Sequence, residues 1–315
     1  MPFPTSGETV FTNLMLSPDE LVPHGHGLRR PECVLAFSDG SLLVSDSSAA
    51  VCLIEPDGET RTIGRMGELP NGLAVTRDGE IIIANIGLGQ LYAIRAGGIE
   101  EVILEEIDGT ELGSVNFPFI DNDGRIWVTV STRTLPRWDA VQSRVPDGYI
   151  LCLDADQTSA RTVLRGLNFP NELRLDHERN AMYVAETSAG RVLKFDFGAD
   201  GVPRNGRPYG PDPLFEGALV DGLALDEEGG LWVTDLKRHA IIRIAPDETA
   251  VTVIEDPEQR IMSFPTSLAF GGDDRRTVYV GSLECPHLLT FRSPVAGVEM
   301  GHWRLKDRLM AVALS

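Results

Sequence analysis

The chain has 315 residues, of which 42% are hydrophobic, and a formal net charge of −19. This acidic balance argues against a nucleic-acid or anionic-membrane partner, because phosphate binding needs clustered Lys and Arg. No signal-peptide pattern opens the sequence, no apolar stretch approaches membrane-spanning length, and the four cysteines are widely scattered. We therefore expect a cytoplasmic protein with free thiols and neither a nucleic-acid nor a membrane partner. The oligomeric state stays open.

Short apolar strands recur along the chain in a fixed phase. Each predicted first strand begins at a polar residue, here called the head residue, and a turn and a second strand follow. In four repeats the head residue lies eight positions before a turn glycine, and successive heads are 39, 45, 55, 50 and 45 residues apart. The six head residues are Glu32, Asn71, Asn116, Asn171, Asp221 and Thr266.

A third strand follows in every repeat, from 51–54 in the first to 287–291 in the last, and several repeats add a fourth, such as 251–254. Repeats of this length with four strands each indicate a β-propeller, in which every blade buries its faces against its neighbours. We predict an all-β, six-bladed β-propeller with four-stranded blades as a single domain over residues 1–315.

The sequence also predicts the structure or role of three segments outside this pattern. A strand at 9–14 is a candidate for closing the ring, and 202–208 has the composition of a turn-rich loop. An insertion at 131–144 joins the second and third strands of the third repeat, on the same face as the head residues. Such a loop could act as a lid over the channel, although a surface elaboration without a role is the alternative. The pattern indicates no helix longer than a turn or two.

The head residues predict a site in the central channel. The innermost strands of a propeller line this channel, so residues in the same phase converge there. All six head residues carry a side-chain oxygen, and none is His or Cys. Carboxylate and amide oxygens suit Ca²⁺, with Mg²⁺, Mn²⁺ or Zn²⁺ as alternatives. Taken singly, Asn-Gly and Asp-Gly are more often turns, and water could replace a cation as the shared partner. We nevertheless predict a central metal site.

Three head motifs carry a family resemblance. Pro31-Glu32, Pro170-Asn171 and Val220-Asp221-Gly222 resemble the metal-site motifs of the regucalcin, gluconolactonase and luciferin-regenerating enzyme family, over about residues 25–295. The resemblance implies one divalent cation bound by Glu32, Asn171 and Asp221. Asn116 is similar to the fourth ligand of the related diisopropyl fluorophosphatase type. The implied activity is hydrolysis of a lactone or related ester, with Asp221 as general base or, alternatively, nucleophile.

Two departures from the family pattern bear on the substrate. Sugar-lactonase members have an Arg two positions before the residue that matches Asn116, and Ser114 stands there in this sequence. Phe117-Pro118 replaces the Asp-Gly that often follows that Asn. A small-molecule lactone or ester less polar than a sugar lactone is therefore predicted. The substrate-binding candidates are Asn71, Ser114, Phe117, Arg133, Trp138, Thr266 and His287.

Two other classes of function compete with a metal-dependent hydrolase. One is a non-hydrolytic enzyme on a scaffold similar to strictosidine synthase. The presence of Glu32, Asn171 and Asp221 argues against this class, because those relatives need no metal. The other is a non-enzymatic propeller that binds calcium or a protein partner. Such a protein would keep its role after substitution of Asp221.

Overall fold

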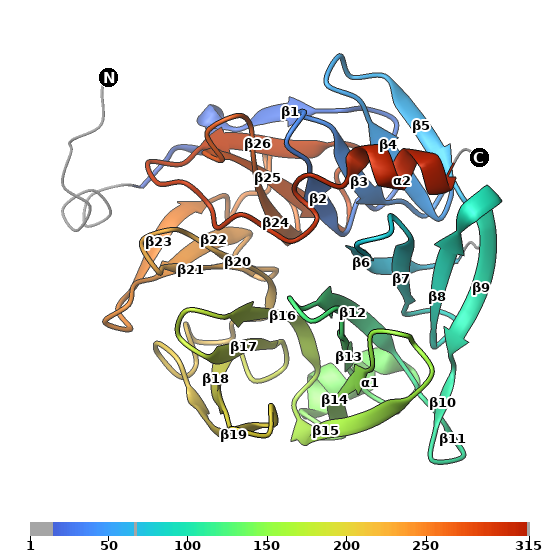
Figure 1. The fold of residues 1–315 in the computed structure, drawn as a ribbon. Coiled ribbons are helices and arrows are strands. Elements are labelled where there is room, and N and C mark those ends of the chain that lie inside the picture. The colour runs from blue at the N-terminus through green and yellow to red at the C-terminus, as the bar shows by residue number, and fades with distance from the viewer. Residues whose placement is uncertain (1–14, 66–67, 314–315) are drawn as a thin grey trace.

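The structure is a computed structural model that describes residues 15–65 and 68–313. Six antiparallel sheets of four strands surround a central axis (Figure 1). In the first five sheets the strands follow one another outward from the axis in chain order. The predicted six-bladed propeller with four-stranded blades is confirmed.

The strand bounds follow the predicted repeats. The first three blades consist of β2 (Val34–Ala36), β3 (Leu42–Ser45), β4 (Val51–Ile54), β5 (Thr60–Ile63); β6 (Pro70–Val75), β7 (Ile81–Asn85), β8 (Gln90–Arg95), β9 (Ile99–Leu104); and β12 (Val115–Ile120), β13 (Ile126–Val130), β14 (Gly148–Leu153), β15 (Ala160–Leu167). The other three consist of β16 (Pro170–Asp176), β17 (Ala181–Glu186), β18 (Arg191–Phe197), β19 (Pro203–Pro208); β20 (Val220–Leu225), β21 (Leu231–Asp235), β22 (Ala240–Ile244), β23 (Ala250–Glu255); and β24 (Pro265–Gly271), β25 (Thr277–Ser282), β26 (Leu288–Arg292), β1 (Val22–His24). A small hairpin of β10 (Glu106–Ile107) and β11 (Thr110–Glu111) extends from the second blade.

The ring is closed by a strand from the beginning of the chain. β1 pairs antiparallel with β26, with Val22 opposite Thr290, and so supplies the outer strand of the last blade (Figure 1). The hydrogen bonds of this pair hold together segments that lie at opposite ends of the sequence. The segment 9–14, predicted as a closing strand, lies outside the described residues.

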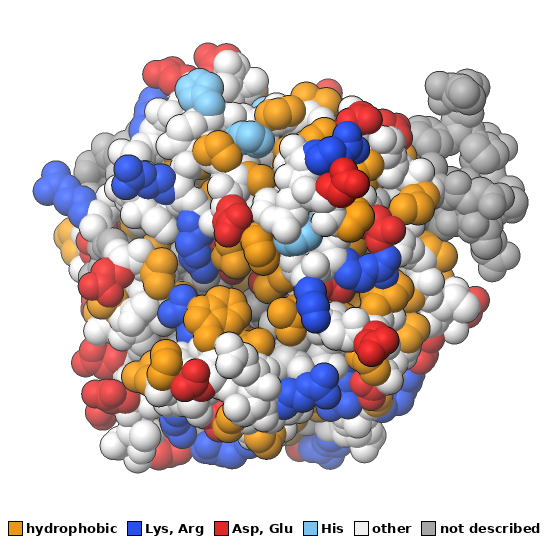
Figure 2. Space-filling view, turned by 180° about the vertical axis from the view of Figure 1, so that it is seen from behind, with side chains coloured by type: hydrophobic (Ala, Val, Ile, Leu, Met, Phe, Trp, Pro, Cys, Tyr) orange, Lys and Arg blue, Asp and Glu red, His pale blue; other side chains and the backbone are white. Residues whose placement is uncertain are grey.

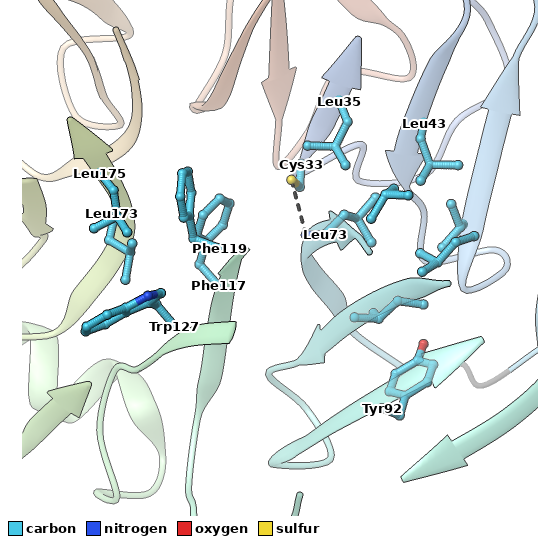
Figure 3. Close-up of a cluster of buried hydrophobic side chains, with 14 of the residues drawn as sticks. Cys33, Leu35, Leu43, Leu73, Tyr92, Phe117, Phe119, Trp127, Leu173 and Leu175 are labelled. Carbon is cyan, nitrogen blue, oxygen red and sulfur yellow. Dashed lines mark hydrogen bonds between the residues drawn. The ribbon is translucent and has the colours of Figure 1, made fainter. Parts of the chain in front are cut away.

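Apolar side chains fill the spaces between neighbouring blades and along the lower channel. One cluster brings Cys33, Leu35, Leu73 and Phe117 together from three innermost strands and the residues just before them (Figure 3). The Leu73 amide donates a hydrogen bond of 3.4 Å to the Cys33 sulfur. Burial of each large apolar side chain stabilises the fold by about 1.5–3 kcal/mol. All four cysteines are buried and free.

The third and fifth blades each contain an equivalent buried hydrogen bond, which fixes the first strand of the blade against the second. The indole of Trp232, on β21, donates to Asp226 Oδ2 at 2.8 Å, and Trp127 makes the equivalent bond of 2.9 Å to Asp121. Asp226 also accepts from Arg243 Nε at 2.6 Å. Each aspartate follows its head residue by five positions. These bonds satisfy polar groups that would otherwise be costly to bury.

Residues 203–208 form a strand, so the predicted turn-rich loop is wrong. β19 pairs with β18, for example Lys194 with Arg207. It is the outermost strand of its blade and its side chains are mostly exposed, so it needs backbone pairing but no apolar alternation.

Two short helices also occur, α1 (Arg137–Ser143) within the predicted insertion and α2 (Lys306–Ala313). No helix within residues 15–65 and 68–313 has the length and apolar character to span a membrane.

The segment 293–313, here called the C-terminal strap, crosses the lower face of the propeller, opposite the head residues. Gly297 forms a β-bridge with Asp226 of the fifth blade. The Ser38 amide of the first blade donates to Trp303 O at 2.7 Å, and Arg308 Nη1 donates to Arg77 O of the second blade at 2.6 Å. α2 lies on the same face (Figure 1). The strap therefore links the first, second and fifth blades on this face.

Candidate metal centre and active site

The head residues are aimed into the channel by irregularities in the innermost strands. In five blades the pairing of the first and second strands shifts register at the head residue, as between Pro170 and Leu173 or between Val220 and Leu223. A bulge of this kind breaks the strict alternation of side chains and redirects the unpaired residue. The polar side chain therefore turns towards the axis while the rest of the strand packs in the core.

Five of the six head residues line one cavity of about 40 Å³ at the upper end of the channel, and they are all buried. This volume holds a cation and a few waters. The residues around the cavity are Arg30, Glu32, Asn71, Ile86, Asn116, Arg137, Trp138, Phe169, Asn171, Thr187, Asp221, Leu236 and Leu283. The structure thus brings together Glu32, Asn116, Asn171 and Asp221, the four predicted metal ligands.

Hydroxyl groups behind two of these amides fix their orientation. Asn116 Nδ2 donates to Ser131 Oγ at 2.9 Å, and Asn171 Nδ2 donates to Thr187 Oγ1 at 3.2 Å. Each amide nitrogen is held on one side, so the carbonyl oxygen takes the other side. The Oδ1 atom of Asn116 accepts from Asn71 Nδ2 at 3.0 Å.

Two oxygens of the cavity have no hydrogen-bond partner. Asn171 Oδ1 and Asp221 Oδ1 are buried and unpaired among the described residues. Leaving such atoms unsatisfied costs about 1–3 kcal/mol each, and more for a charged group. Together with the Glu32 carboxylate they form an oxygen-only donor set, which is the set that hard divalent cations bind. The residues present therefore fit a Ca²⁺-type ion.

Two carboxylates of the cavity have raised pKa values. Burial, with a smaller contribution from the carboxylate of Glu172, raises the pKa of Glu32 to about 7 although the Arg30 charge opposes this. Burial and the neighbouring Glu32 and Glu172 raise the pKa of Asp221 well above its ordinary value. A bound cation would favour the charged forms of both groups.

Five predicted substrate-binding residues do not line this cavity. The Thr266 hydroxyl donates to Glu32 O at 2.6 Å and braces the backbone behind the site. Arg133 turns outward, with its guanidinium 4.6 Å from the Tyr149 ring centre. Ser114 lines an outer groove, and His287 lies away from the cavity. Phe117 lines a separate cavity of about 170 Å³ on the lower side, where the Arg174 guanidinium lies 4.9 Å from its ring centre.

The insertion at 131–144 contributes to the site through α1. Arg137 and Trp138, its first two residues, line the cavity, and Trp138 is 46% exposed at its mouth. Figure 2 views this face from the side opposite α2, and hydrophobic and basic side chains gather near its centre. The predicted position of the insertion on the head face is therefore confirmed. Its movement stays a prediction.

Three residues of the site were not predicted from the sequence pattern. Arg30 precedes the first head residue by two positions, and no other repeat has an Arg at the matching position. The repeat pattern therefore did not indicate that Arg30 reaches the cavity. Thr187 and Ser131 directly follow the second strands of adjacent blades. That shared position could have identified them as the partners of Asn171 and Asn116.

The fold and this cavity define a class of six-bladed propellers with an oxygen-lined centre. Residues 30–284 match the family model described as SMP-30/Gluconolactonase/LRE-like region, and the chain belongs to that family. The resemblance noted in the sequence is confirmed.

Individual relatives are distant. The 6-deoxy-6-sulfogluconolactonase of Pseudomonas putida is 25% identical over 193 residues, which cover 61% of this chain and 62% of that protein. A gluconolactonase structure from Xanthomonas campestris superimposes with a TM-score of 0.71 at 19% identity and covers 87% of this chain and 89% of that one. A calcium-binding regucalcin from Agrobacterium tumefaciens gives 0.66 at 16% identity, with coverages of 90% and 95%. The chain matches about three fifths of the length of the first curated relatives.

Proposed function

We propose that this protein is a metal-dependent hydrolase that opens a lactone or a related ester. The observation that carries the proposal is the pair of unpaired buried oxygens, Asn171 Oδ1 and Asp221 Oδ1, in an oxygen-lined cavity. The lactonases among its relatives support the reaction class. The calcium-binding regucalcin supports Ca²⁺ as the ion.

Four residues would hold the cation: Glu32, Asn116, Asn171 and Asp221. When bound, a divalent ion polarises an ester carbonyl and lowers the pKa of a bound water. Asn116 and Asn171 are held by Ser131 and Thr187, so their carbonyl oxygens would keep a fixed position during the reaction. This preorganisation would also orient the substrate.

Asp221 would move the proton. It lies at the cavity with one oxygen unpaired, and its backbone is fixed because the Gly222 amide donates to Thr234 Oγ1 at 2.7 Å. In its charged form Asp221 would accept a proton from the attacking water and return it to the leaving alkoxide. Direct attack by the carboxylate on the carbonyl is the alternative route.

The mouth of the cavity supports a substrate with an apolar body. Trp138, Phe169, Leu236 and Leu283 surround it, together with Ile86. These side chains would exclude water from the reacting ester and strengthen the electrostatic interactions within the site. A sugar lactone, which carries several hydroxyl groups, would leave many of those hydroxyls without hydrogen-bond partners among these apolar side chains.

A panel of lactones tests the proposal, from gluconolactone to dihydrocoumarin. The protein is stripped with a chelator and reloaded with Ca²⁺, Mg²⁺, Mn²⁺ or Zn²⁺. Turnover should require a metal, fall by at least 10³-fold in Asp221→Asn, and favour the aromatic lactone. Asp247→Asn, which removes the same charge from an exposed turn, is the control. Absence of turnover with every metal, or equal turnover in Asp221→Asn, would refute the proposal.

A further inference from the structure

Two arginines at the cavity have no role in binding a cation. Arg30 comes from the segment before β2, and Arg137 is the first residue of α1, so different elements bring them to the same cavity. Arg30 is anchored by hydrogen bonds of 3.0 Å to Pro70 O and 2.6 Å to Asn71 Oδ1. Its backbone has a φ of 56°, which non-glycine residues rarely adopt. The chain thus bears a local strain where it presents this side chain.

Arg137 has no acidic partner. No residue within 15–65 and 68–313 gives its guanidinium a hydrogen bond or an ion pair, and its nearest ring contact is Trp138, at 5.9 Å. Burial, and then the neighbouring Arg30 charge, lower the pKa of Arg137. A half-buried guanidinium beside another positive charge is unfavourable unless an anion joins them.

The charge balance of the region also indicates that an anion binds beside the two arginines. Three carboxylates, from Glu32, Asp221 and Glu172, line the cavity or lie beneath it. Three guanidiniums accompany them, from Arg30, Arg137 and Arg174. With every group counted in its charged form, these charges sum to zero before any cation binds. A divalent ion would therefore leave an excess of two positive charges in a mostly buried site, which a negatively charged ligand would reduce.

We propose that Arg30 and Arg137 bind an anionic group of the substrate, so that the preferred substrate is a lactone or ester with a carboxylate next to an apolar body. This inference rests on the proposed function and specifies its substrate class. Planar guanidiniums bind carboxylates through paired, charge-assisted hydrogen bonds. Trp138 and Phe169 would contact the apolar part. Arg133, a predicted substrate-binding residue, points away from the cavity.

Binding of an unreactive probe separates this proposal from the hydrolase proposal. The probe is tetrahydrofuran-3-carboxylate, and the corresponding primary amide, which is not an ester, is the neutral control. Calorimetry with Ca²⁺-loaded and metal-free protein measures both ligands on wild type, Arg137→Gln and Arg144→Gln. Arg144 is exposed near the other end of α1 and lacks contact with the cavity, so its substitution removes the same charge elsewhere.

The carboxylate should bind wild type more tightly than the amide does, and more tightly with Ca²⁺ than without it. Its Kd should rise about tenfold or more in Arg137→Gln and stay unchanged in Arg144→Gln. Equal binding of carboxylate and amide to wild type, or an unchanged carboxylate Kd in Arg137→Gln, would overturn the proposal. If Arg137-dependent binding appears while no lactone is turned over, the anion site stands and the hydrolase proposal fails.

Discussion

Glu32 offers a direct test of the electrostatic strain within the metal-free site. Its pKa in the folded protein is about 7, against an ordinary value of 4.5. Between these two pH values the folded protein keeps a proton that the unfolded chain releases. The free energy of unfolding therefore falls as the pH rises through this window. A difference of this size corresponds to about 3 kcal/mol.

The comparison is between wild type and Glu32→Gln, both free of metal, unfolded with urea at pH 4.5, 5.5, 6.5 and 7.5. The stability of wild type relative to the variant should fall by about 3 kcal/mol across the series, since glutamine does not titrate. Saturating Ca²⁺ at pH 7.5 should stabilise wild type more than the variant. A difference between the two proteins that is independent of pH would refute the burial argument.

Three further predictions concern the supports of the site and of the fold. Ser131→Ala and Thr187→Val should each weaken Ca²⁺ binding about tenfold in calorimetry, because they release the Asn116 and Asn171 amides; an unchanged Kd would show that the hydroxyls do not orient them. Asp226→Ala should lower the free energy of unfolding by about 3–5 kcal/mol, because it removes the carboxylate that pairs with buried Arg243. Glu228→Gln, which removes a 42% exposed carboxylate 3.9 Å from Arg243, is its control, and equal losses would contradict the reasoning. Gly222→Ala would place a Cβ 1.9 Å from Thr266 O and should lower the Tm by several degrees, whereas Gly301→Ala, whose Cβ meets nothing within 4 Å, should not.

The number of blades and the residues of the oxygen-lined cavity could be predicted from the sequence, because both recur in the same phase of each repeat. A head residue before each inner strand identified the positions that converge, and Glu32, Asn116, Asn171 and Asp221 do meet at one cavity. Asn71 was also placed there by phase alone. Repetition is thus the information that a single sequence supplies about contacts between distant residues.

Features that do not repeat could not be predicted. The bulge at Asn116 shifts the register before Phe117, so Phe117 packs on the lower side instead of at the mouth. Arg30 reaches the cavity from a connection whose path depends on tertiary contacts. The outer strand β19 is held by backbone pairing and has no apolar pattern to reveal it.

The position of the C-terminal strap bears on how substrate and product reach and leave the upper cavity. The upper cavity shares no lining residue with the lower one, which Met300, His302 and Leu305 of the strap help to line. The exposed ring of Trp138 marks an opening of the upper cavity on the face opposite the strap. A ring-opened product that leaves by this opening would share it with incoming substrate.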